Sequence, residues 1–244
     1  MAIAESASIE EVMSRNLKEK DEIHNLGPLL QLTNSAMPIG GFSYSEGLEQ
    51  LIEQKIISDY NTLKIWIEDS LNFGTIRLEA CVLKRVYDAK VAHDKKSLLF
   101  WDEWLLATME AEELRRQSLD MGRALQRLLA SLINNGSHLE KYQPTLKNYA
   151  SVFGEAIADW EIPLAPALYG YLYRWVSSTL DVGIKLIPMG QSAGQKCLWN
   201  IHPLLEEKVS ELLSLSDEDL YSWNIGIVLA SMHHETQYSR LYRS

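Results

Sequence analysis

Cysteine is scarce in this sequence, long apolar runs are missing, and acidic residues outnumber basic ones. Two cysteines, Cys81 and Cys197, cannot form a disulfide framework, and their apolar neighbours predict buried free thiols. No apolar run approaches the roughly 20 residues that a membrane-spanning helix needs. The first residues include Glu5, Glu10 and Glu11, where a signal peptide has its apolar centre. These absences predict a cytoplasmic protein that does not enter a membrane.

Several kinds of ligand site are also missing. The formal net charge of −10 argues against a nucleic-acid partner, because binding to phosphates requires clustered Lys and Arg. The sequence contains no G-x-x-x-x-G-K-[ST] loop for a nucleotide and no H-E-x-x-H or E-x-x-H pair for a metal. His233 and His234 are adjacent, so a helix would point them about 100° apart. We therefore expect no tightly bound cofactor and no metal cage within the chain.

The sequence is rich in apolar residues that are spaced as in an α-helix. Hydrophobic residues make up 46% of the chain, which is enough for one sizeable core. Residues 1–24 are polar and mixed in charge, and they predict a flexible lead-in. Residues 25–244 then form the folded part. The predicted fold class is an all-α, single-domain bundle of roughly seven to ten helices.

Individual helices are predicted from apolar residues spaced three and four positions apart. A short helix carries Leu48, Leu51 and Ile52. Longer helices are expected at residues 63–87, 104–132, 144–160, 163–187, 190–215 and 216–244. The last of these opens at Ser216 with a capping residue and acids in its first turn. Its final turns would place His234, Tyr238, Leu241 and Tyr242 on one face, either docked on the core or presented to a partner.

A second pattern is typical of a hydrolase. Residues 190–194 fit the G-x-S-x-G nucleophile elbow around Ser192, and Asp217 and His234 follow in the order of a hydrolase triad. The elbow, however, requires a strand that feeds a helix in an α/β sheet, and the sequence offers no series of alternating strands. A serine hydrolase is therefore kept as an alternative. The simpler interpretation is a glycine-rich turn at which two helices meet closely.

A stripe of arginines has two interpretations as well. Arg116, Arg123 and Arg127 fall on one face of a helix and could meet a phosphate or an acidic partner. The more ordinary interpretation pairs them on a solvated surface with Glu112, Glu113 or Asp120. A generic helical interaction protein is therefore kept as a further alternative function beside the serine hydrolase.

Residues 29–49 are predicted to form a short apolar helix, a Pro-Gly turn and the start of another helix. Ser43 or Ser45 is expected to cap that second helix. Phe42 and Tyr44 lie beside the turn, where their rings either plug the core or form a contact patch. Core packing is the favoured prediction for both.

Three blocks of the sequence, at residues 37–49, 186–195 and 231–244, resemble the UreF family of urease accessory proteins. Weaker similarity is found at residues 113–115, 121–122 and 153–154. Three positions depart from the usual family pattern: His233 stands where Arg is usual, Tyr242 where Phe is usual, and Ser192 where Thr is frequent. The last difference weakens the hydrolase alternative. The residues matched to the family motif in the first two blocks are Pro38, Gly40, Phe42, Ser43, Gly47, Glu49, Gly190, Gln191 and Gly194.

The resemblance implies a non-enzymatic, all-helical homodimer. In the family, such a protein bridges the accessory protein UreD, also called UreH, to the GTPase UreG, and the assembly delivers nickel to apo-urease. Nickel would then be handled by the complex. The resemblance places the UreD contact in a C-terminal segment that orders on binding. Its matched residues are Thr236, Gln237, Tyr238, Ser239, Arg240, Leu241, Tyr242 and Arg243. Whether Arg116 or Arg240 reaches the nucleotide of UreG stays open, and positioning of the GTPase is favoured over catalysis.

Overall fold

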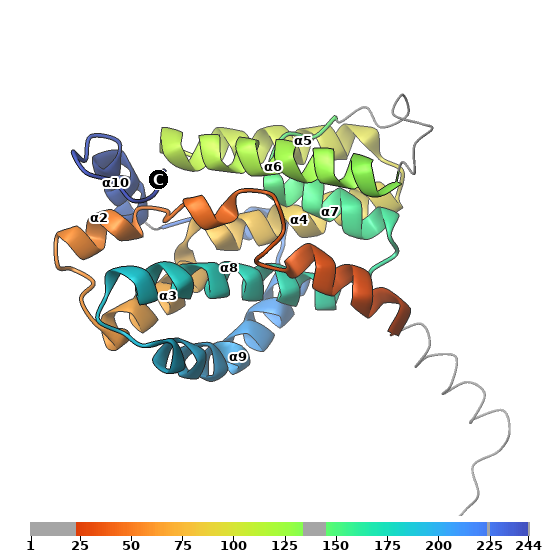
Figure 1. Ribbon diagram of the computed structural model, residues 1–244. Coiled ribbons are helices and arrows are strands. Elements are labelled where there is room, and N and C mark those ends of the chain that lie inside the picture. The colour runs from red at the N-terminus through yellow and green to blue at the C-terminus, as the bar shows by residue number, and fades with distance from the viewer. Residues whose placement is uncertain (1–22, 134–144, 224, 244) are drawn as a thin grey trace, which may run out of the picture.

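Helices and short 3-10 turns account for all the regular secondary structure of the described residues. The computed structural model describes residues 23–133, 145–223 and 225–243, and these ranges contain no strand (Figure 1). A first helix covers residues 23–33. The elements that follow are η1 (Gly41–Ser43), α2 (Leu48–Glu53), α3 (Tyr60–Phe73), α4 (Thr75–Val91), α5 (Lys95–Thr108), α6 (Glu112–Ile133), α7 (Tyr149–Asp159), α8 (Leu164–Leu186), α9 (Gln191–Ser214), η2 (Asp217–Asp219) and α10 (Ile225–His234).

The central element is α4, which is packed by α3, α5, α7, α8 and α9. Its Cys81, Val82 and Leu83 are fully buried. Helix α7 approaches α4 so closely that a Cβ added at Gly154 would lie 2.7 Å from the carbonyl oxygen of Leu83. One apolar core cluster joins most of the buried hydrophobic side chains. The predicted all-α, single-domain fold is therefore confirmed.

The helices predicted at residues 163–187 and 190–215 are confirmed within one or two residues. Helix α8 starts directly after Pro163, whose ring suits the entry to a helix. Helix α9 starts at Gln191 and continues past Pro203 to Ser214. Cys81 and Cys197 are free and buried, as predicted.

Two predicted helices are each divided by a break. The helix expected at residues 63–87 divides at Gly74, whose extended backbone ends α3 through a bond from its N–H to the Ser70 carbonyl. The helix expected at 104–132 divides between α5 and α6, where Met109 is extended and buried. The guanidinium of Arg115 donates to the Met109 carbonyl at 2.6 Å and stabilises that break. Apolar spacing continues across both breaks because the residues on each side still face the core.

The helix expected to begin at Pro144 begins instead at Tyr149. The buried carboxylate of Asp102 accepts from the backbone N–H groups of Lys147 and Asn148, at 2.9 and 3.0 Å. These bonds hold the incoming chain in a non-helical path up to the N-cap Asn148. A partner 46 positions away in the sequence therefore determines this helix start.

The prediction of one helix from Ser216 to the end is wrong. Residues 217–219 form the 3-10 turn η2, in which the Ser216 hydroxyl donates to Asp219 and the Asp217 carboxylate accepts from Arg85. Helix α10 ends at His234. Residues 235–243, here called the tail, continue as turns and an irregular loop over α2. His234, Tyr238, Leu241 and Tyr242 therefore do not share a helical face.

Residues 1–22 of the predicted flexible lead-in lie outside the described residues, and the first described helix begins at residue 23. Within the described ranges, no helix has the length and apolar character required to cross a membrane.

Candidate functional site

The carboxylate of Glu49 on α2 holds the tail. One of its oxygens accepts from the backbone N–H of Leu241 at 2.7 Å, and the other accepts from that of Tyr242 at 2.9 Å. Glu49 is buried, so these charge-assisted bonds are shielded from water. Two consecutive amides of the tail are thereby fixed on the body of the protein.

The imidazole of His234 lies between two carboxylates. Its Nε2 is 3.2 Å from Glu49 Oε2, and its Nδ1 is 2.9 Å from Glu113 Oε2, on the first turn of α6. The side chain of His234 is 0% exposed. This histidine therefore joins the end of α10 to both α2 and α6, and α10 lies beside each of them at this end of the bundle (Figure 1).

Arg240 of the tail completes the arrangement. Its guanidinium donates to the second oxygen of Glu113 at 3.1 Å. Glu49, Glu113, His234 and Arg240, here called the charge cluster, thus connect four segments of the chain. Because each carboxylate in the cluster has bonds on both oxygens, the arrangement fixes the tail in both position and orientation.

Tyr242 is the buried apolar anchor of the tail. Its ring is 6% exposed, and the ammonium of Lys185 on α8 lies 5.8 Å from the ring centroid. Burial, followed by the nearby charges of Glu49 and Asp181, raises the pKa of the Tyr242 phenol. The phenol oxygen is buried without a hydrogen-bond partner among the described residues. The next residue, Arg243, donates its backbone N–H to the Ser43 carbonyl at 2.8 Å.

Gly47 makes the contact between α2 and α10 possible. Its φ of +79° lies in the left-handed region, and a Cβ there would lie 2.9 Å from the backbone nitrogen of Ser231. Gly47 and Glu49 belong to the first family-like block, whereas Ser231 and the tail belong to the third. The structure therefore brings two of the three blocks into direct contact.

The remaining motif residues of the first block shape the turn before α2. Gly40 also has a φ of +79°, and its carbonyl accepts from the Ser43 hydroxyl at 2.7 Å. Ser43 therefore bonds backward and does not cap α2, whose N-cap is Gly47. The Ser45 hydroxyl accepts from the Glu49 N–H at 3.4 Å, but Ser45 is not the N-cap either, so the prediction of a serine cap is wrong.

The aromatic residues of this turn face in different directions. Tyr44 is buried as predicted, and its hydroxyl donates to Asp120 at 3.3 Å. Phe42 is 69% exposed, so its predicted role as a core plug is wrong. Pro38 is also exposed. Tyr44 and Phe42 are only two positions apart. Their side chains point in different directions because Phe42 lies within the 3-10 turn η1 and Tyr44 follows it with an extended backbone.

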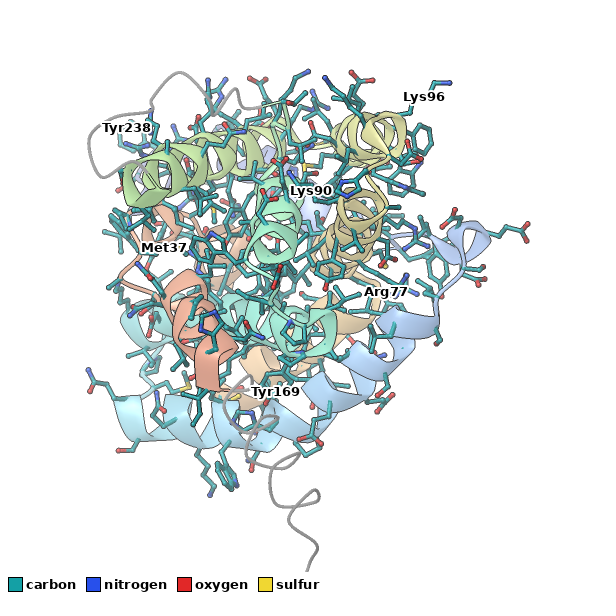
Figure 2. The ribbon with its side chains drawn as sticks, turned by 90° about the vertical axis from the view of Figure 1, so that its right-hand side faces the viewer. Met37, Arg77, Lys90, Lys96, Tyr169 and Tyr238 are labelled. Atoms are coloured by element: carbon teal, nitrogen blue, oxygen red, sulfur yellow. The ribbon has the colours of Figure 1, made fainter. Side chains whose placement is uncertain are left out.

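The outer side of the tail is exposed to solvent. Tyr238 is fully exposed and lies at the edge of the molecule (Figure 2), and Leu241 is 67% exposed. Thr236 and Ser239 are exposed polar residues, and the half-buried Gln237 donates to the Ser239 carbonyl at 3.0 Å. Of the predicted partner-binding residues, Tyr242 therefore faces inward and Tyr238 and Leu241 face outward.

A buried polar cavity lies next to the same turn. It has a volume of about 50 Å³ and is lined by Glu46, Glu79, Gln117, Tyr171, Arg174 and Trp175, among others. Glu46 accepts from Trp175 and Gln117, both at 2.8 Å, and Glu79 accepts from the Tyr171 hydroxyl at 2.7 Å. Burial, together with the charge of Glu46, raises the pKa of Glu79 to about 8. Burial likewise raises the pKa of Glu46.

The sequence did not identify Glu46 or Glu79 as site residues. Glu79 lies on the central helix α4, between the buried Leu78 and Ala80. Glu46 has a φ of +54°, which is uncommon for a residue other than glycine. The sequence carries no clear signal for Glu79, because Arg77 lies two positions away and makes the segment look like an ordinary amphipathic helix. It also carries no signal for the unusual backbone conformation of Glu46.

The second family-like block forms the junction between α8 and α9. Gly190 is the N-cap of α9, and Gln191 is its exposed first residue. Gly194 lies against α8, because a Cβ there would be 2.6 Å from the Ile184 side chain. This arrangement confirms the simpler interpretation of the block as a turn where two helices meet closely.

The structure does not assemble the hydrolase triad. Ser192 is exposed in the first turn of α9 and follows no strand within the described residues. Asp217 pairs with Arg85 at 2.7 Å, and both ring nitrogens of His234 face glutamates. The hydrolase alternative is therefore wrong on geometry.

The arginine stripe on α6 forms surface ion pairs. Arg116 pairs with Glu112 and Arg123 with Asp120, all four being at least partly exposed. In the parts of the chain that the structure describes, no three His, Cys, Asp or Glu side chains gather closely enough to hold a metal ion. His233 is exposed, whereas His234 is buried.

Comparison with known proteins agrees with this geometry. Residues 57–202 match the model of the UreF family. The chain is 46% identical over 216 residues to the urease accessory protein UreF of Microcystis aeruginosa, covering 88% of this chain and 96% of that protein. It is 44% identical over 221 residues to that of Nostoc sp. (strain PCC 7120), covering 91% and 96%.

A third relative, the urease accessory protein UreF of Synechocystis sp. (strain PCC 6803), is 41% identical over 227 residues, covering 88% and 96%. These relatives are accessory proteins and not enzymes themselves, in agreement with the prediction that this chain is not an enzyme. The similarity to these relatives covers 88–91% of this chain. The chain belongs to the UreF family of urease accessory proteins.

Proposed function

We propose that the protein is a non-enzymatic adaptor in the maturation of the urease nickel centre. It would bind the accessory protein UreD (UreH) through α10 and the tail and would hold the GTPase UreG on another surface. The complex would act in the cytoplasm, where the free thiols of Cys81 and Cys197 stay reduced. Nickel is cargo of the assembly in this proposal.

The observation that carries the proposal is the opposed orientation of the tail residues. Glu49 and the buried Tyr242 hold the inner side of the tail against the body of the protein. Tyr238 and Leu241, on the outer side of the tail, stay exposed to solvent. A tail fixed in this way loses little conformational entropy when a partner binds, so its exposed side chains are prepared for contact.

Helix α10 extends the exposed apolar surface. Ile225, Leu229 and Met232 are exposed and share one helical face, because they are spaced four and three positions apart. A helix with three large apolar residues facing water favours a covering partner. The exposed His233 and Arg243 flank this surface with polar groups, as is typical of the rim of an interface.

Substitution of both outward residues tests the UreD contact. We expect Tyr238→Ala combined with Leu241→Ala to weaken binding of purified UreD by at least about 10-fold, since exposed aromatic anchors often carry more than about 1.4 kcal/mol. Binding would be measured by calorimetry, and complex size by chromatography with light scattering. Phe100→Ala removes an aromatic residue that is 55% exposed on α5, away from the tail, and serves as the control.

The folded state of the double variant must be checked by its melting temperature. Both residues are largely exposed, so the melting temperature should stay within the range of surface substitutions. Unchanged UreD affinity in a folded double variant would contradict the proposed contact. Equal weakening by Phe100→Ala would show that the effect is not specific to the tail.

Positioning of the GTPase is favoured over direct catalysis. An arginine finger must reach the nucleotide of its partner, but Arg116 and Arg240 both form ion pairs within this chain. We expect Arg116→Ala and Arg240→Ala to leave the rate of GTP hydrolysis by bound UreG within about twofold of wild type. A loss of about 1,000-fold, the size of an arginine-finger effect, would reverse this assignment.

A homodimer would hold two copies of UreG around a two-fold axis. Light scattering on the isolated protein gives its mass directly, and a monomer at all concentrations would oppose this part of the proposal. The UreD contact would still stand, because it uses residues of one chain only.

A further inference from the structure

The charge cluster contains one structural requirement that the adaptor role does not explain. Both ring nitrogens of His234 face carboxylate oxygens, at 2.9 and 3.2 Å. An ionised carboxylate only accepts hydrogen bonds, and a neutral imidazole carries a single N–H. With both carboxylates ionised, both contacts are therefore hydrogen bonds only when the ring is the doubly protonated imidazolium.

The charges around the ring balance in that state. Glu49 faces it from α2 and Glu113 from α6, and Arg240 of the tail lies on the far side of Glu113. Two negative groups then meet two positive groups. Buried charges are tolerated when they are paired and hydrogen-bonded, as all four are here.

Removal of one proton breaks this balance. The proton would leave to solvent, and a nitrogen lone pair would then face a carboxylate at hydrogen-bond distance. Two carboxylates would be left with only Arg240 to compensate them. Because Glu49 is the group that holds the amides of Leu241 and Tyr242, repulsion at the ring acts directly on the anchor of the tail.

We propose that His234 is a proton-dependent latch, which fixes the tail on α2 and α6 while the imidazole is protonated and releases it when the proton leaves. The latch controls the surface to which UreD binding is assigned above, and in that respect its consequence rests on the proposed function. The latch itself is a property of the isolated chain. Alkaline conditions should therefore free the tail and reduce presentation of Tyr238 and Leu241.

Hydrogen exchange on the isolated full-length protein tests the latch. Protection of the amides in residues 235–243 would be measured from about pH 6 to about pH 9 and corrected for the intrinsic exchange rate. A single linked proton changes the equilibrium between docked and released tail by about tenfold per pH unit within its window. We expect wild-type protection to fall by at least about tenfold across this range.

His233 supplies a matched control next to the latch. It is exposed, so His233→Gln should keep the wild-type pH dependence. His234→Gln should show low tail protection at every pH. Glu113→Gln should keep the tail docked with a flatter pH profile, because an amide side chain can donate to the unprotonated ring nitrogen.

The results distinguish the latch from the adaptor role. Tail protection that does not depend on pH, or the same change in His233→Gln as in His234→Gln, would overturn the latch. UreD affinity of the wild type, measured at the two ends of the pH range, is a separate readout. A pH-dependent tail in a protein that never binds UreD supports the latch and opposes the proposed function.

Discussion

Glu49 and Tyr242, 193 positions apart in the sequence, are joined by a 2.9 Å hydrogen bond from the Tyr242 amide to the Glu49 carboxylate. The second oxygen of the same carboxylate holds the amide of Leu241. A single buried side chain on a six-residue helix thus determines the path of the tail.

Glu49→Gln should loosen the tail. A glutamine offers one acceptor oxygen where the two amides now use both carboxylate oxygens, so one amide loses its partner. The expected loss in the free energy of tail docking is about 1–3 kcal/mol. Trypsin cleavage after Arg240 measures this opening, because that bond lies within the anchored segment. The exposed Glu53→Gln on the same helix is the control, and equal cleavage rates in both variants would indicate that packing of Tyr242 alone holds the tail.

Three glycine substitutions should destabilise the protein in a defined order. Gly190 is exposed with open space around it and an ordinary φ, so Gly190→Ala should change the free energy of unfolding by less than about 0.5 kcal/mol. Gly40→Ala faces only the unfavourable left-handed φ, at a cost of about 1 kcal/mol. Gly47→Ala combines that φ with a 2.9 Å approach to the Ser231 nitrogen and should cost more than Gly40→Ala. Denaturant unfolding gives the order, and a Gly47 variant as stable as the Gly40 variant would show that α10 moves aside freely.

Tyr242→Phe should be neutral or stabilising by up to about 1 kcal/mol. The phenol oxygen is buried with no hydrogen-bond partner among the described residues, so its removal ends a desolvation cost. The buried ring and its proximity to Lys185 are kept. Thermal unfolding measures the change, and Tyr242→Ala, which also removes the ring, should lower stability by several kcal/mol. A clear loss of stability in Tyr242→Phe would indicate a bound water on that oxygen.

Local marks at their starts placed two helices, although the break at Gly74 was missed despite its glycine. Pro163 and Gly190 mark the starts of α8 and α9, and both helices were placed within one or two residues. The break at Met109 was missed because it has no Gly or Pro and is stabilised by Arg115. The spacing of apolar residues indicates which residues face the core, but it does not indicate where the backbone turns between two helices.

The site was predicted only in part, because its residues come from distant parts of the sequence. The family resemblance selected Gly47, Glu49 and the tail, but no spacing pattern could place them in contact. The tail was expected to be helical because its residues fit helical spacing. Tertiary bonds to Glu49 determine its path instead, and bonds across 192 or 193 positions leave no local signal.

Glu79 should make the stability of the protein depend on pH. Its pKa rises from 4.5 to about 8, mainly because burial disfavours the carboxylate and also because Glu46 is nearby. Since the folded form keeps this proton where the unfolded form has lost it, the contribution of Glu79 to stability is fully present below about pH 4.5 and is lost as the pH rises to about 8. The contribution lost over this window is on the order of 5 kcal/mol.

Glu79→Gln isolates that contribution. The amide remains neutral and its oxygen can still accept from the Tyr171 hydroxyl, so the cavity keeps its hydrogen bond. We expect this variant to lose less stability than wild type between pH 6 and pH 9, with the difference measured by urea unfolding at each pH. Glu53→Gln changes an exposed glutamate and should reproduce the wild-type profile. Parallel profiles for wild type and Glu79→Gln would mean that the carboxylate stays ionised in the folded protein, with Arg174 and cavity water offsetting the burial.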